Sequence, residues 1–181
     1  MTTAVATKWT IDPTHSEASF KIKHLVISTV TGYFREFSGS ISTDGDDWAD
    51  AEAEFTAQID SVDTNQAQRD AHLKSDDFFN AEKYPELTFK STSVEKIDNE
   101  HYKMTGDLTI RDVTKKVVLD AQFLGEAVDP YGQTKAGFEI TGVINRQEFG
   151  LKWSAITEAG AIVASNDVRL SLNVQVIKQQ V

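Results

Sequence analysis

The chain has 181 residues, 40% of them hydrophobic, and a formal net charge of −10. This length suits a single domain, spanning residues 1–181, with one hydrophobic core. The negative charge excludes duplex nucleic acid as a partner, because phosphate binding needs a basic surface, and it opposes docking on an anionic membrane.

The absence of cysteine excludes disulfides, thiolate zinc sites and cysteine nucleophiles. The N-terminal stretch MTTAVATKWTIDP has neither a basic segment nor an apolar run of about seven residues, so it does not resemble a signal peptide. No stretch reaches the roughly 20 apolar residues of a membrane-spanning helix. We therefore expect a cytoplasmic protein without stable membrane insertion. A periplasmic location would apply if an export signal had been removed.

Alternation of apolar and polar residues predicts β-strands along most of the chain. The clearest segments are ASFKIKH (18–24), AEAEFTAQI (51–59), ELTFKSTSV (86–94), GFEITGVI (137–144) and VRLSLNVQV (168–176). Turn residues separate these runs, as in the Asp44-Gly45 and Asp129-Pro130 pairs. About eight strands with short connections between neighbours predict an all-β, up-and-down antiparallel barrel.

The segment from about residue 64 to 84 breaks the strand pattern and predicts a short helical insertion. We expect a helix over residues 66–73 and then a second short turn that carries Phe78 and Phe79. Pro85 favours an extended conformation at the preceding residue, Tyr84, and the strand pattern resumes after it. Because adjacent helical residues point about 100° apart, we expect only one of the two phenylalanines to enter the barrel directly.

Histidines and neighbouring carboxylates are the candidate catalytic or metal-binding groups. Asp12, His15 and Ser16 lie together, but triad members seldom adjoin in sequence, and this stretch is more typical of a turn. On one extended strand, His15 and His24 would lie about 30 Å apart on opposite faces and would not share a metal. His72 has Asp76 and Asp77 nearby in sequence. We predict no catalytic residue, metal or cofactor; an enzyme that uses these rim histidines and carboxylates is the alternative.

The interior of the predicted barrel leaves two interpretations open. An eight-stranded barrel is just wide enough to be filled by side chains or to hold one small ligand. Phenylalanines occur in nearly every predicted element, which favours a filled core that serves only stability or partner docking. Small inward residues such as Ala18, Ala53, Ala121 and Gly142 leave space, which favours a ligand.

Five sequence blocks occur in order from about Trp9 to the last predicted strand. They are WTIDPTHSEASFKIKHL, GYFREFSGSI, RDAHLKSDDFFNAEKYPELTFKS, GDLTIRDVTKKVVL and NRQEFGL. In this combination the chain resembles the YceI family of lipid- or polyisoprenoid-binding proteins. The resemblance implies an extended eight-stranded antiparallel, lipocalin-like barrel with a helical insertion. It also implies an apolar pore for a long-chain amphiphile, and a homodimer.

We therefore expect the protein to bind and to sequester or transport a polyisoprenoid, an isoprenoid quinone or a fatty-acid-like lipid, without catalysis. The predicted ligand-binding residues are Phe20, Phe34, Phe37, Phe55, Phe78, Phe79, Phe89, Phe138, His15, His24, His72 and Arg146. For Arg146, a surface ion pair with Glu148 is the alternative. Relatives often have glycine where Asp112 stands, and we expect Asp112 to adopt the left-handed conformation of that hairpin.

Overall fold

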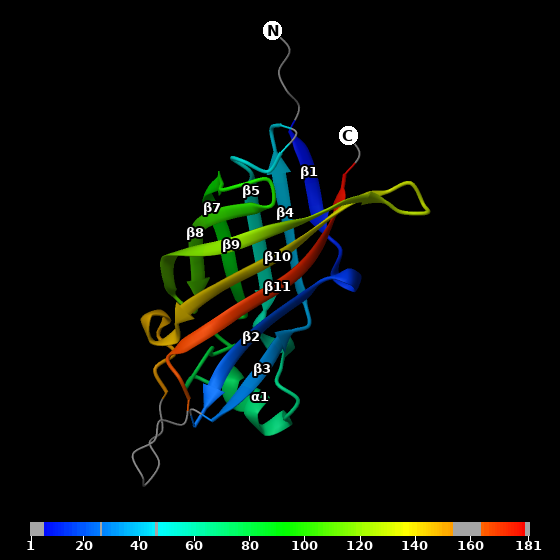
Figure 1. Cartoon of the computed structure of the whole chain (residues 1–181). Coiled ribbons are helices and arrows are strands. Elements are labelled where there is room, and N and C mark those ends of the chain that lie inside the picture. The colour runs from blue at the N-terminus through cyan, green and yellow to red at the C-terminus, as the bar shows by residue number, and fades with distance from the viewer. Residues whose placement is uncertain (1–5, 26, 46, 154–163, 180–181) are drawn as a thin grey trace.

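The structure is a computed structural model and describes residues 6–25, 27–45, 47–153 and 164–179. Its strands are β1 (Thr7–Ile11), β2 (Glu17–His24), β3 (Ser28–Phe34), β4 (Phe37–Thr43), β5 (Glu52–Gln58), β6 (Val62–Asp63), β7 (Glu86–Lys96), β8 (His101–Ile110), β9 (Val113–Val128), β10 (Thr134–Asn145) and β11 (Asp167–Lys178). They form one antiparallel sheet, and a single α-helix, α1 (Ala67–Lys74), lies between β6 and β7 in the described part of the chain (Figure 1).

The eleven strand segments form eight long strands, because three of these strands are broken. β1 and β2 both pair with β11, through Trp9 opposite Lys178 and Phe20 opposite Leu170. β3 pairs with β2, and β4 pairs with β1. On the other side, β6 pairs with β3, and β5 pairs with β4. The long strands follow one another in chain order, and β11 closes the ring onto the first. The predicted eight-stranded antiparallel barrel is confirmed.

The break between β1 and β2 is a short 3-10 turn, Pro13–His15, capped by Asp12. The Asp12 carboxylate accepts hydrogen bonds from the backbone and hydroxyl of Thr14, and His15 Nδ1 lies 2.8 Å from its Oδ2. The Thr14 hydroxyl and the His15 imidazole hold the pKa of Asp12 below its ordinary value. The prediction that this stretch is a turn leading into a strand is confirmed, because His15 is the last residue of the turn and β2, which ends at His24, begins at Glu17.

The faces of the strands follow the predicted alternation. On β11, Val168, Val174 and Val176 are buried, whereas Arg169 and Asn173 between them are exposed. The inward set on β11 is therefore the apolar one, and its members Val168, Val174 and Val176 line the barrel interior.

Helix α1 covers the end of the barrel that lies away from both termini (Figure 1). The side chain of Gln66 caps it by accepting from the Arg69 backbone N–H. After the helix, Phe78 N–H donates to the Ser75 carbonyl and Phe79 N–H donates to that of Leu73. This turn is not helical, so both phenylalanines are buried, and the expectation that only one enters the interior was wrong. No helix of the described residues has the length and apolar content to span a bilayer.

Candidate ligand cavity

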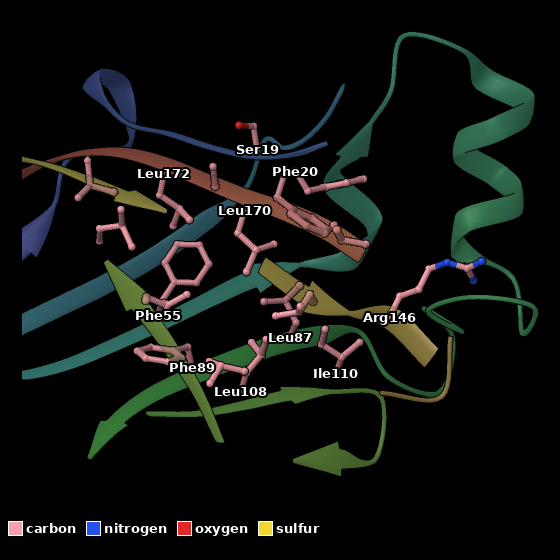
Figure 2. A pocket seen from close by; sticks show the side chains of 18 of the residues that line it. Ser19, Phe20, Phe55, Leu87, Phe89, Leu108, Ile110, Arg146, Leu170 and Leu172 are labelled. Carbon is pink, nitrogen blue, oxygen red and sulfur yellow. The ribbon is translucent and has the colours of Figure 1, made fainter. Parts of the chain in front are cut away.

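A cavity of about 560 Å³ runs through the barrel and is lined mainly by apolar side chains of the strands. Figure 2 shows Phe55, Phe89 and Leu108 on one side, facing Leu170 and Leu172 on the other. The volume lies within the range of about 300–1,000 Å³ that is typical of ligand pockets. The interior is therefore not filled by side chains, which favours the ligand-holding interpretation of the sequence.

Ten of the twelve predicted binding residues line this cavity. They are Phe20, Phe34, Phe55, Phe78, Phe79, Phe89, Phe138, His24, His72 and Arg146. The other two lie elsewhere. Phe37 packs against Phe55 with ring centroids 5.8 Å apart, and His15 lies on the turn between β1 and β2 with 59% of its side chain exposed. For these two the expected ligand contact is not supported by their position.

Four aromatic rings close the cavity at the end of the barrel where the termini lie. Trp9 (β1), Trp48 (from the loop between β4 and β5), Phe123 (β9) and Phe138 (β10) form this aromatic plug. The Trp48 ring is central, with centroids 4.7 Å from Phe138 and 5.0 Å from Trp9. Sequence alternation did not reveal Trp48, because it lies in a loop whose tertiary contacts carry it inward.

The histidine, glutamine and arginine side chains that line the cavity gather at the opposite end, beside α1, and we call this end the mouth. Ser40 (β4), Glu54 (β5) and Tyr102 (β8) also line the cavity. His24 ends β2, and Gln66, Arg69 and His72 belong to α1 or its cap. His72 lines the cavity while 38% of its side chain is exposed, so the cavity approaches solvent here. The apolar interior therefore ends in a partly exposed polar rim.

His72 is held in the mouth by aromatic rings and a carboxylate. Its ring packs edge-to-face on Phe78 and Trp153, with centroids 5.1 Å and 4.9 Å away. Its Nε2 lies 2.8 Å from the Asp77 carboxylate. These contacts orient the imidazole beside the cavity while leaving its edge accessible to a polar ligand group.

Arg146 is buried, with 2% of its surface exposed, and its guanidinium points toward the α1 end of the cavity (Figure 2). The guanidinium donates to the carbonyls of Leu151 and Trp153 at 2.7 Å, and to those of Ser165 at 2.9 Å and Ala164 at 3.3 Å. Burial lowers the pKa of Arg146 below its ordinary value. The alternative of a surface ion pair with Glu148 was wrong, because the arginine instead joins two backbone segments beside the mouth.

Arg111 joins the turn that carries Phe78 to the hairpin between β8 and β9. Its guanidinium donates to the carbonyls of Asp76 and Phe78, both at 3.0 Å, and pairs with the Asp76 carboxylate at 2.9 Å. Its own backbone is left-handed, with φ of 57°. The left-handed residue of this hairpin is therefore Arg111. The expectation that Asp112 would adopt this conformation was wrong.

Arg69 makes a similar connection at the start of α1. It donates from Nε to the Thr64 hydroxyl at 2.7 Å and from Nη2 to the Thr64 carbonyl at 2.6 Å. Three arginines thus use their donors to fix the backbone around the mouth. As for metals, the described ranges contain no group of three or more His, Asp and Glu residues arranged to hold an ion.

Comparison with known proteins places this geometry in a family. The model described as "YceI-like domain" matches residues 9–176. Protein YceI of Escherichia coli O157:H7 is 41% identical over 179 residues, which cover 98% of this chain and 90% of that protein. A Campylobacter jejuni YceI protein of known structure is 42% identical, with a TM-score of 0.74 over 88% of this chain and 91% of that one.

A more distant structure shares only the fold. It is a polyisoprenoid-binding domain from Saccharophagus degradans that is described as implicated in plant cell wall breakdown. It is 18% identical, with a TM-score of 0.66, and the match covers 94% of this chain and 98% of that domain.

Proposed function

The chain belongs to the YceI-like family, and from this premise we propose that it binds the tail of a polyisoprenoid-type lipid inside the barrel and sequesters or carries that lipid. The observation that carries the proposal is the cavity of about 560 Å³ with its mainly apolar wall between the plug and the mouth. The polyisoprenoid-binding domain of the same fold supports the choice of ligand class.

The lipid would lie with its tail toward the aromatic plug and its head at the mouth. The mouth offers Gln66, His24 and His72 as hydrogen-bonding groups, whereas the plug is aromatic, and its buried, unpaired indole N–H belongs to Trp9, which does not line the cavity. A polar head placed at the plug would lose hydration without gaining comparable partners, which disfavours the reverse orientation. We therefore place the entrance beside α1.

Burial of the tail is sufficient to drive binding. If each methylene-sized group occupies about 30 Å³, similar to a water molecule, the cavity holds on the order of 20 such groups. At about 0.8 kcal/mol for each buried group, the gross gain is on the order of 15 kcal/mol. Ordering a flexible tail offsets part of this gain. The head group would therefore select among lipids rather than decide whether a lipid binds.

A neutral head, such as an alcohol, a quinone or an amide, fits the mouth better than a diphosphate. Arg146 and Arg69 line the cavity but direct donors to backbone carbonyls and to Thr64. The net charge of −10 also opposes the approach of an anion. Hydrogen bonds from His72 and Gln66 suit a neutral group.

We propose binding without turnover. A histidine-based enzyme would need its acid and base groups within reach of one substrate position. His15 lies on the outer turn beside Asp12, whereas His24 and His72 line the cavity, so the structure does not bring the three together at one point. The pairs that His15 and His72 form with Asp12 and Asp77 orient these imidazoles without joining them.

The test is native mass spectrometry of the freshly purified protein, followed by organic extraction and by uptake of geranylgeraniol. We expect an added mass of several hundred daltons that is released as a prenyl or acyl compound, or stoichiometric uptake of geranylgeraniol by protein purified without lipid. A clean protein mass together with no uptake would overturn the proposal.

A further inference from the structure

Four glycines face the inside of the barrel from the middle of strands β3, β4, β8 and β10. Each lies beneath a cavity-lining side chain of an adjacent strand. A Cβ atom added at the glycine would lie 2.2 Å from Phe20 Cζ at Gly32, 2.6 Å from Ile11 Cδ1 at Gly39, 2.4 Å from Phe89 Cζ at Gly106, and 2.4 Å from Leu119 Cδ2 at Gly142.

These distances mean that the glycines provide niches in the barrel wall. A Cβ in a real structure essentially never lies under 3.0 Å from another heavy atom, so any other residue would displace the side chain above it. The strands close the wall behind that side chain, which leaves the cavity as the direction of displacement. The space at Gly142, which the sequence assigned to a ligand, is in fact taken by Leu119.

At two of the niches, an added Cβ would collide with side-chain atoms only and not with the backbone. At Gly39 and Gly106 an added Cβ would also meet a backbone oxygen, that of Glu54 at 2.7 Å or Lys90 at 2.6 Å, so glycine is needed there for the approach of the strands. At Gly142, the next backbone atom is 3.7 Å away, and at Gly32 the three nearest atoms all belong to the Phe20 ring. Both residues have ordinary strand backbone, which alanine adopts without strain.

We propose that Gly32 and Gly142 determine the width of the cavity, and that this width is what admits a methyl-branched prenyl tail in addition to a straight acyl tail. The inference rests on the proposed binding function. A branched chain has a larger cross-section than a linear chain with the same number of carbons, so it is the first to be excluded when a side chain is pushed inward. The niches hold Phe20 and Leu119 flat against the wall and preserve that extra width.

The experiment compares two alcohols with the same carbon count and the same head, geranylgeraniol and straight-chain eicosanol, by displacement of a fluorescent fatty-acid probe. In Gly142→Ala we expect the affinity for geranylgeraniol to fall about tenfold, because the added methyl group pushes Leu119 into the cavity, while that for eicosanol changes about twofold or less. Gly137→Ala, on the same strand, is the control, because its Cβ would lie 3.7 Å from Leu124, an ordinary contact.

A compensating variant makes the test specific. Gly142→Ala combined with Leu119→Ala removes the displaced side chain and should restore geranylgeraniol binding toward the wild-type value. If Gly142→Ala does not fold, as judged by circular dichroism, Gly32→Ala with and without Phe20→Leu provides the same comparison at the second niche. An equal loss for both alcohols, or no loss, would overturn the inference while leaving the proposed function intact. Failure of the wild type to bind either alcohol would refute the proposed function and the inference with it.

Discussion

The two ends of the barrel are closed by different physical means. At the end where the termini lie, Trp9, Trp48, Phe123 and Phe138 pack ring against ring. At the mouth, arginine side chains hold backbone segments in place through hydrogen bonds, and partly exposed residues such as His72 and Trp153 form the rim. The aromatic packing leaves the Trp9 indole N–H buried without a partner, whereas the arginine donors at the mouth bond to backbone carbonyls. From this difference we expect the plug to contribute more to stability and the mouth to serve as the proposed entrance.

The largest effect is expected at the plug. Trp48→Ala removes the central ring and should lower the free energy of unfolding by about 3–5 kcal/mol, the usual cost of truncating a buried large aromatic residue. Urea unfolding measures this loss. Trp153→Ala is the matched change at the mouth, and it should cost less than half as much, because Trp153 is only partly buried. Equal losses would remove the distinction between the two ends.

Arg146 tests whether the mouth depends on hydrogen bonds. Arg146→Met leaves the carbonyls of Leu151, Trp153, Ala164 and Ser165 without their donor. We expect a loss of about 2–3 kcal/mol in the free energy of unfolding, since unsatisfied buried acceptors are costly but a buried charge is also removed. Arg146→Lys keeps the charge without the planar fork and should be about equally destabilised. Wild-type stability in the lysine variant would show that charge alone matters.

Arg111 affects stability in two ways, through its side-chain bonds to the turn that carries Phe78 and through its left-handed backbone. Two substitutions distinguish the two contributions. Arg111→Ala and Arg111→Gly both lose the bonds to Asp76 and Phe78, but only glycine adopts φ of 57° without cost. We expect alanine to lower the free energy of unfolding by about 1–2 kcal/mol and glycine to lower it by about 1 kcal/mol less. Thermal unfolding of both variants provides the measurement. A less stable glycine variant would show that the left-handed backbone is not a source of strain.

The smallest effect is expected at Asp12, which caps the turn between β1 and β2. Its pKa is lowered by hydrogen bonds from Thr14 and His15, so its contribution to stability is present above the unfolded pKa of about 3.9 and is lost as the pH falls through the folded value. Asp12→Asn should be less stable by about 1 kcal/mol at pH 7. Urea unfolding should show this difference shrinking below about pH 4, and a difference that stays constant down to pH 2 would contradict the assignment.

Much of the fold could be predicted from the sequence, because strand alternation is local. The inward faces of β5 and β11 and the place of the helical insertion follow from neighbouring residues. The plug could not be predicted, since Trp48 lies in a loop and reaches its partners only through tertiary contacts. Arg146 was singled out as a site residue, but its role was missed, because its carbonyl partners at Leu151 and Ser165 carry no side-chain signal. The predicted homodimer and cytoplasmic location stay predictions.

The central claim is that a lipid tail lies in the barrel with its head at the mouth and its end at the plug. Fluorescence quenching by nitroxide-labelled stearyl alcohols, which carry a neutral head, tests it directly, because Trp48 and Trp153 line opposite ends of the cavity. In Trp153→Phe, which leaves the plug tryptophans, a nitroxide near the methyl end should quench more strongly than one near the hydroxyl group. In Trp9→Phe combined with Trp48→Phe, which leaves Trp153, the order should reverse. The same order in both variants, or no quenching in either, would contradict the account.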